Sequence, residues 1–286
     1  MSGGGAMKRF QILDHAILIA GVLFMLIPVW IVFASSTHRP ETLLSDGLQF
    51  WFGDYFWETY TTVLFQGSGF TGQVNALLML KNSMILGLGF SIGKIAISTL
   101  AAYAIVYFRF RAGNLIFWMI FSSLLLPLEV RILPSYEVVS QLGMLNSYTG
   151  LILPLIASAT ATFFFRQFYK SVPDELLESA RIDNAGPFRF FVDILWPLST
   201  TMVAAIFIIM FVVGWNQYLW PILMTTDEGY YTIVMGIKQI LNELEGNNVP
   251  KYNEAMALAI LALLPPVLVV VVFQRWFVKG LVETEK

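Results

Sequence analysis

The chain lacks several of the residue types on which reactive sites depend. It contains no cysteine in 286 residues, which excludes disulfides, thiolate metal ligands and cysteine nucleophiles. Its two histidines, His15 and His38, lack the spacing of a metal site. Charged residues are also scarce, at 13% where a soluble domain carries about 25%. A formal net charge of -2 gives no indication of nucleic-acid binding.

Catalytic and nucleotide-binding motifs are missing as well. The nearest approach to a Walker loop, Gly87–Ile95, has Leu88 at the first glycine position and Ile95 in place of Ser or Thr. Gly67–Gly72 matches Gly-x-Gly-x-x-Gly in letters, but no predicted strand precedes it, so a flexible loop is favoured over a dinucleotide site. The apolar stretches contain no Ser/His, Asp/Asp or His-Glu-x-x-His set. We therefore expect no enzyme activity, no metal and no bound cofactor, and any energy source has to be another polypeptide or an ion gradient.

Apolar sequence, by contrast, is abundant, at 57% of the residues. A membrane-spanning helix needs about 20 mainly apolar residues, and six stretches meet that requirement. They are His15–Ala34, Lys81–Tyr107, Asn114–Leu133, Ser147–Phe168, Leu195–Gln217 and Glu254–Val278. No small-residue cleavage site follows the first stretch, so we expect it to remain as a span. The predicted fold class is an all-α membrane protein with six transmembrane helices.

The distribution of Lys and Arg predicts the orientation of these spans, because such residues collect on the cytoplasmic side. One side holds Lys8, Arg9, Arg109, Arg111, Arg166, Lys170, Arg181, Arg189, Arg275, Lys279 and Lys286. The other side holds Arg39, Lys81, Arg131, Lys238 and Lys251, and Lys94 falls inside the second span. Both termini are therefore expected in the cytoplasm.

This orientation predicts the following organisation of the chain. The parts are a cytoplasmic tail (1–14), the first transmembrane helix (15–34), a periplasmic loop (35–80), a core of five spans (81–278) and a second cytoplasmic tail (279–286).

A charged segment, Pro173–Pro197, separates the fourth and fifth spans. Its opening residues, Pro173–Glu175, suit the first turn of a helix, where negative charge meets the positive end of the helix dipole. Asn184–Gly186 is a stop signal, and Pro187 can start a second short helix. The pattern predicts a cytoplasmic helix–turn–helix that serves as a docking surface. The alternative is an ordinary solvated loop.

The same segment resembles the cytoplasmic coupling motif of ABC importer permeases, which runs Glu-Ala-Ala, three residues, Gly, then an apolar run ending in Pro. Glu178–Ala180 fill the first part, Asp183–Ala185 the middle and Pro197 the end. Ser179 stands where the motif has Ala, and Asn184 where it has Gly, although Asn also tolerates the left-handed backbone that ends a helix.

The resemblance implies a role for the first of these two helices. In that family it sits in a groove of a cytoplasmic ATPase subunit, and its glutamate helps to hold the contact. When two such ATPases close on ATP and Mg, the spans rock from inward- to outward-facing. The residues that inherit this coupling role are Glu178, Ala180, Asp183 and Ala185, on coupling helices expected within 173–190.

The likeness extends over almost the whole chain to the second permease of carbohydrate-type ABC importers, the branch that includes the maltose importer. Within that branch it is closest to permeases that import sn-glycerol-3-phosphate. The stretches that carry it are Leu126–Pro134, Ala157–Gln167, Gly214–Pro221 and Lys279–Lys286. It implies a type I importer in the bacterial inner membrane, with a homologous second permease, two ATPase subunits and a periplasmic solute-binding protein. Glycerophosphodiesters are candidate further substrates.

Polar residues inside the spans are candidates for the substrate path, because a charge at the bilayer centre has to face a cavity or a partner. Lys94 shares a helix face with Gly87, Ser91 and Ser98, and Asn82 lies toward the outer end. Such a small and polar face lines either a helix interface or a path. A structural Lys94, paired with a carbonyl or an acid, is the equal alternative.

Two broken helix ends supply the other candidates. Pro127 and Pro134 are expected to break the third span beside Glu129 and Arg131, and a guanidinium fits phosphate well. An internal pair between Glu129 and Arg131 is the rival interpretation. At the end of the fifth span Asn216 and Gln217 are able to bind a hydroxylated solute or to join an interface belt.

Three rival functions remain to be compared with the import of sn-glycerol-3-phosphate. The nearest rival is a permease for a neutral sugar or polyol, but the two cations Lys94 and Arg131 suit an anionic substrate better. A self-sufficient secondary transporter would need coupling carboxylates within its spans, and no Asp or Glu lies at their centres. A structural membrane protein without transport would not need the coupling motif.

Overall fold

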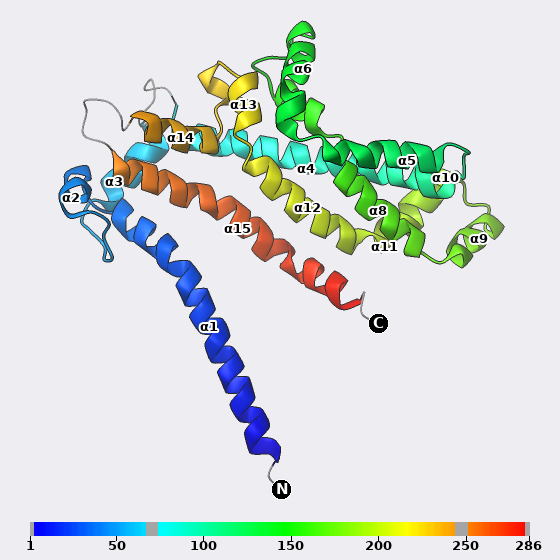
Figure 1. Ribbon diagram of the computed structural model, residues 1–286, viewed down its shortest axis with the longest axis horizontal. Helices are drawn as coiled ribbons and strands as arrows, with labels where there is room; N and C mark the ends of the chain where they lie inside the picture. The colour runs from blue at the N-terminus through cyan, green and yellow to red at the C-terminus, as the bar shows by residue number, and fades with distance from the viewer. Residues whose placement is uncertain (1–2, 67–73, 244–250, 284–286) are drawn as a thin grey trace. The chain divides into compact units, whose positions relative to one another are not determined.

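The computed structural model describes residues 3–66, 74–243 and 251–283, with side chains at 13–66, 74–127, 130–240 and 251–276. Every regular element in these residues is a helix (Figure 1). The chain divides into two compact units. The first unit is Met1–Leu77 with Gly236–Leu263, and the second unit is Leu78–Met235 with Leu264–Lys286. The Gly67–Gly72 letter match lies outside the described residues.

The first unit is built around one long apolar helix. Its elements are α1 (Gly3–Ser36), α2 (Pro40–Asp46), α3 (Phe56–Phe65), most of α14 (Ile233–Glu243) and the first part of α15 (Tyr252–Glu283). Residues 13–28 of α1 are all exposed although they are almost entirely apolar. An exposed apolar surface of this extent is suited to lipid.

The end of α1 is fixed by polar contacts with the segment that follows it. The Ser35 hydroxyl accepts a hydrogen bond from the Gln49 amide at 2.9 Å, and the Ser36 and Tyr60 hydroxyls lie 3.0 Å apart. Burial raises the pKa of Tyr60, and the bond to Ser36 partly opposes that rise. Trp51 and Trp57 project outward from the same segment, with 79% and 74% of their surface exposed.

The second unit contains the remaining helices, beginning with most of α4 (Ala76–Tyr107). The others in order are α5 (Gly113–Ser122), η1 (Ser123–Leu125), α6 (Leu128–Gln141), α7 (Tyr148–Ile152), η2 (Leu153–Leu155), α8 (Ala159–Ser171), α9 (Asp174–Ile182), α10 (Pro187–Phe190), the π-helical η3 (Phe191–Leu195), α11 (Trp196–Leu198), α12 (Thr200–Trp215), α13 (Leu219–Met224) and η4 (Glu228–Tyr230). Within this unit α8 packs against both α5 and α12 (Figure 1).

Three single helices in the described residues are long and apolar enough to cross a membrane, and up to six spans result if each bent pair counts as one. The single helices are Leu13–Ser36, Ala76–Tyr107 and Tyr252–Trp276. The bent pairs are Gly113–Leu125 with Val130–Gln141, Tyr148–Leu155 with Ala159–Ser171, and Pro187–Leu198 with Thr200–Trp215. The bent pairs fall on the predicted third, fourth and fifth spans.

The third predicted span departs most from its prediction. The helix breaks at Pro127 as expected, and the chain turns by 106°. Pro134 does not break α6, which continues to Gln141. A proline inside a helix removes one backbone hydrogen bond, here to the carbonyl of Val130.

The fifth predicted span is divided by a bend within its first turns. The sequence placed its start at Leu195, whereas the two halves meet at Ser199 with a bend of 73°. Pro197 offers no N–H to the carbonyl four residues before it, and the chain widens into a π-helical turn just upstream. The apolar stretch is thus split between α12 and the short helices that precede it.

A buried amide joins distant parts of the second unit. The Asn82 side chain is 1% exposed, and its nitrogen donates to the carbonyls of Gly229 and Tyr231, each at 2.9 Å. Its oxygen accepts a hydrogen bond from the Tyr148 hydroxyl at 2.7 Å. One side chain therefore holds α4, α7 and the η4 turn together.

Replacing this amide should be costly, because it would leave a hydroxyl and two carbonyls without their partner. We expect Asn82→Ala to lower the free energy of unfolding by about 2–4 kcal/mol. Denaturant unfolding of the purified chain in detergent measures the change. The control is Asn216→Ala, which removes an exposed amide bonded only within its own helix. An equal loss in both variants would show that the cross-link is not stabilising.

Candidate functional site

The polar face of α4 meets the break in the fourth span. The Lys94 ammonium donates to the carbonyl of Ala157 at 3.3 Å, and the Ser98 hydroxyl donates to the carbonyl of Ser158 at 3.3 Å. Both carbonyls belong to the non-helical residues between η2 and α8. The Ser91 hydroxyl instead bonds back to Gly87 of its own helix at 2.8 Å. The stripe predicted from sequence is thus a helix interface with polar contacts.

Glycines allow this close approach. A Cβ on Gly89 would lie 2.5 Å from Ile152, and one on Gly93 would lie 2.5 Å from Ile156. Because real side chains do not tolerate such distances, only glycine fits at these two positions without movement of the neighbour. The glycines therefore bring the broken segment within reach of Lys94.

Lys94 carries a charge that its surroundings only partly satisfy. The residue is 9% exposed, and its ammonium lies 4.2 Å from the centre of the Phe90 ring. In the described residues it has one hydrogen bond and no acidic partner. An ammonium has three donors. Lys94 thus makes the structural contact that was one of its two expected roles, and its ammonium keeps further donors for an anion.

Arg131 lies near this group and is exposed. It lines a cavity of about 410 Å³ together with residues of α6, η2 and the segment between them, including Ser135, Met144 and Pro154. Arg131 and Lys94 are close enough to interact electrostatically. Lys94 is not part of the cavity lining, but two cations that repel one another favour the approach of an anion. The side chain of Glu129 lies outside the described residues, so its predicted pairing with Arg131 stays a prediction.

The amides among the predicted path residues are engaged within the protein. All three hydrogen bonds of Asn82 described above are internal. Asn216 and Gln217 donate to the carbonyls of Val212 and Val213 at 2.9 and 3.2 Å, and so cap the end of α12. A solute would have to displace these bonds to reach the amide nitrogens.

One buried cation was not recognised from the sequence. Arg166 was counted among the charges of the cytoplasmic side, inside the predicted fourth span, and the structure places it in α8 with an exposure of 8%. Its guanidinium lies over the Phe117 ring of α5, 3.8 Å from the ring centre. The available signal for a buried polar site was Arg166 followed by Gln167 within a mainly apolar stretch. The burial itself could not be predicted, because the stacking partner Phe117 lies on another helix.

The predicted helix–turn–helix is present, and its sides differ in exposure. Ala180 is buried with Phe190 and Tyr169 in one hydrophobic cluster, against which Ala185 packs. Glu178 and Asp183 are exposed. Ile182 and Phe188 are also exposed, at 80% and 79%. The arrangement presents acids and large apolar side chains outward, as a docking surface requires.

The turn that ends α9 has the geometry of a Schellman motif. The Ala185 amide donates to the carbonyl of Ala180 at 2.8 Å, and the Asn184 amide donates to that of Arg181 at 3.1 Å. Asn184 has a positive φ of 56°. This is the left-handed position that glycine usually occupies and asparagine tolerates. The substitution of Asn for Gly in the motif is therefore compatible with its shape.

Comparisons with known proteins relate the chain to a family of membrane transport components. The sequence profile of the family described as "Binding-protein-dependent transport system inner membrane component" matches residues 94–283. This range contains Lys94, Arg131 and the whole of α9.

Two relatives match almost from end to end. One, from Brucella melitensis biotype 1, is 48% identical over 276 residues, covering 96% of this chain and 97% of the relative. Another, from Pectobacterium atrosepticum, is 48% identical over 279 residues, covering 98% of each. Both are named sn-glycerol-3-phosphate transport system permease protein UgpE.

A solved structure shares the fold. The crystal structure of a bacterial ABC transporter involved in the import of the acidic polysaccharide alginate contains a chain that aligns with a TM-score of 0.79 and 19% identity. The alignment covers 95% of this chain and 98% of the other.

The left-handed conformation of Asn184 in the Schellman turn leads to a testable prediction. A β-branched residue in the left-handed region is strained by about 1–2 kcal/mol, so Asn184→Val should loosen the end of α9. We expect trypsin to cleave the purified full chain after Arg181 about threefold to tenfold faster than the wild type. Asn184→Gly is the matched control and should be cleaved no faster. Equal rates for Val and wild type would contradict this account.

Proposed function

The chain belongs to the family of binding-protein-dependent transport system inner membrane components, and we propose that it is a permease subunit that carries sn-glycerol-3-phosphate into the cytoplasm. The 48% identity with relatives of that name, over nearly the full length, is the observation that carries the proposal. The chain itself does no covalent chemistry in this proposal, and a separate ATPase supplies the energy by hydrolysing ATP with Mg.

The substrate proposal is supported by the charge near the fourth-span break. A glycerol phosphate carries a dianionic phosphate and two hydroxyl groups. Lys94 and Arg131 offer two cations without an acidic partner among the described side chains, and their hydrogen-bond donors match phosphate oxygens. We assign the three amides among the path candidates, Asn82, Asn216 and Gln217, to positioning of the helices around this charge.

The membrane arrangement in this proposal has six spans, with each bent pair crossing once. Both termini and α9 lie in the cytoplasm, on the side where Lys and Arg collect. Bent helices leave carbonyls free at membrane depth, which is tolerated where the backbone lines a cavity or is buried in protein. The cavity beside Arg131 meets that condition.

The proposed partners follow from the exposed surface of α9. A cytoplasmic ATPase subunit receives α9, with Glu178 and Asp183 toward the contact and Ala180 and Ala185 holding the helix to its own unit. Two ATPase subunits, a homologous second permease and a periplasmic solute-binding protein complete the importer. Glycerophosphodiesters, which keep the phosphate, are proposed as additional substrates.

Uptake in cells tests the substrate. Cells without this chain and without other glycerol-phosphate carriers should regain uptake of labelled sn-glycerol-3-phosphate when it is restored, and should not gain uptake of a neutral disaccharide. Lys94→Met and Arg131→Gln should each lower uptake by about tenfold or more, because a charge-assisted hydrogen bond contributes about 1.5–3 kcal/mol.

The control for this experiment is Lys81→Gln, which removes an exposed cation from the same helix α4. The amount of each variant in the membrane is measured by immunoblot. If both charge variants transport the phosphate at the wild-type rate, the proposed anion site is wrong. Uptake of the disaccharide alone would instead support the permease of a neutral sugar importer.

Reversing the charge of Glu178 tests the coupling role. Glu178→Lys should abolish uptake and the stimulation of ATP hydrolysis by loaded binding protein, while the chain remains in the membrane, because a like-charge contact replaces an attractive one. Asp193→Lys is the control, since it alters an exposed acid of the same segment whose pair with Arg189 contributes little. Normal uptake by Glu178→Lys would rule out the coupling assignment.

A further inference from the structure

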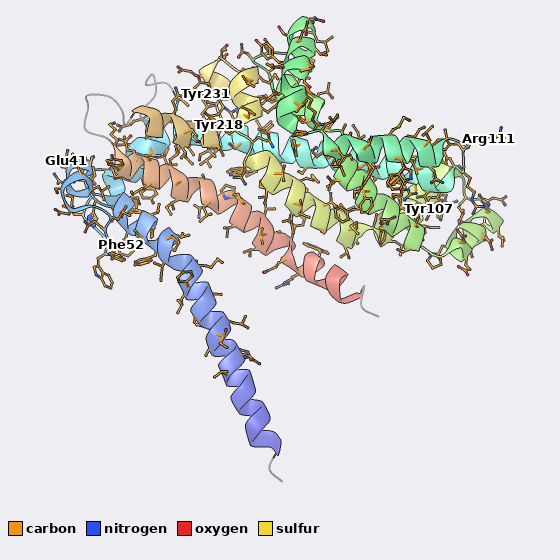
Figure 2. All side chains as sticks on the ribbon, viewed as in Figure 1. Glu41, Phe52, Tyr107, Arg111, Tyr218 and Tyr231 are labelled. Atoms are coloured by element: carbon orange, nitrogen blue, oxygen red, sulfur yellow. The ribbon has the colours of Figure 1, made fainter. Side chains whose placement is uncertain are left out.

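A basic pocket lies in the second unit, away from the proposed substrate path. It has a volume of about 360 Å³ and is formed by the end of α4, the start of α5, the end of α8 and the residues that connect them. The lining residues on which the argument depends are Arg109, Arg111, Asn114, Arg166, Lys170 and Asp174. Figure 2 labels Tyr107 and Arg111 at this end of the unit.

The charges of the pocket are unbalanced. Its lining, as far as the structure describes it, has four cationic side chains, Arg109, Arg111, Arg166 and Lys170, and one acid, Asp174. None of the four cations forms an ion pair with a described acid. Like charges gathered without a counter-charge repel one another, so the free pocket favours an anion.

Arg166 gives the pocket a fixed, buried donor group. The residue is 92% buried, since its exposure is 8%, and its ring contact with Phe117 sets the plane of the guanidinium. Its two terminal nitrogens donate to the side-chain oxygens of Asn114 and Gln167 at 3.3 and 3.5 Å. Its Nε is buried and has no partner among the described atoms. A buried donor left unpaired is unfavourable, so the guanidinium retains one hydrogen-bond donor that its described protein neighbours do not use.

The pocket lies where apolar helices end. α4 ends at Tyr107, α5 begins at Gly113 and α8 ends at Ser171, so the ends of three apolar segments meet there. Exposed Phe108 and Phe110 flank the cations at this level. Helix ends of this kind lie at the depth of lipid headgroups, where basic pockets between spans receive anionic groups.

We propose that this pocket binds a phosphate group, from either an anionic phospholipid headgroup or a soluble phosphate compound. Guanidinium groups form paired hydrogen bonds with phosphate oxygens, and three of the four cations are arginines. Asp174 limits the affinity, because its carboxylate repels the same anion. The site is independent of the substrate proposal, since it shares no residue with the Lys94 and Arg131 region.

Thermal unfolding of the purified full importer in lipid nanodiscs tests this proposal. One arm compares pure phosphatidylcholine with equal parts of phosphatidylcholine and phosphatidylglycerol. The other arm adds inorganic phosphate to phosphatidylcholine discs, against potassium chloride of equal ionic strength. A ligand that binds only the folded state raises the melting temperature. The variants are Arg111→Gln/Lys170→Gln, whose side chains are exposed, and Arg189→Gln as a control outside the pocket.

A rise in the lipid arm that the double variant loses and Arg189→Gln keeps would assign the pocket to a headgroup. The same pattern in the phosphate arm would assign it to a soluble compound. In either case Asp174→Asn should enlarge the rise. No rise in either arm, or an equal rise in wild type and double variant, would overturn the proposal. An acidic side chain of a partner subunit filling the pocket would give that negative result.

Discussion

The carbonyl groups freed at the break in the fourth span have to be satisfied within the protein, because hydrocarbon offers them no hydrogen bonds. The carbonyls of Ala157 and Ser158 receive donors from α4, through Lys94 and Ser98. Gly89 and Gly93 are the reason that α4 comes close enough to supply them. The polar stripe of one helix and the bend of another are therefore one structural feature.

The polar residues of the spans differ in how many of their hydrogen-bonding groups remain unused after these internal contacts. Asn82 uses both kinds of amide group on its own protein, whereas Lys94 keeps donors beyond its bond to Ala157. A residue that closes a helix break and still carries unused donors can hold the backbone and attract an anion at once. The structural and functional interpretations of Lys94 are thus compatible. Asn82, by contrast, would have to break its internal hydrogen bonds before it could bind a solute.

Local signals predicted the α9 turn and the break at Pro127, whereas the effect of each proline and the burial of side chains between helices could not be predicted from local sequence. The acids at the start of α9 and Asn184 at its end act within a few residues, so the sequence indicated both limits. Pro127 and Pro134 look alike in sequence, yet only the first breaks the chain. The burial of Arg166 was not predicted either, since it depends on Phe117, which is remote in the sequence.

The position of α4 also explains how movement at the proposed docking surface would reach the charged region. Tyr103 donates its hydroxyl to the carbonyl of Pro187 at 2.8 Å, and Tyr107 donates to that of Tyr169 at 3.2 Å. These contacts tie the end of α4 to the residues on either side of α9. Lys94 lies on the same unbroken helix, so no flexible loop separates it from those contacts. A force applied to α9 would then displace Lys94 together with the Ala157 carbonyl to which Lys94 donates. Coupling of an external ATPase to the substrate path requires such a joint movement.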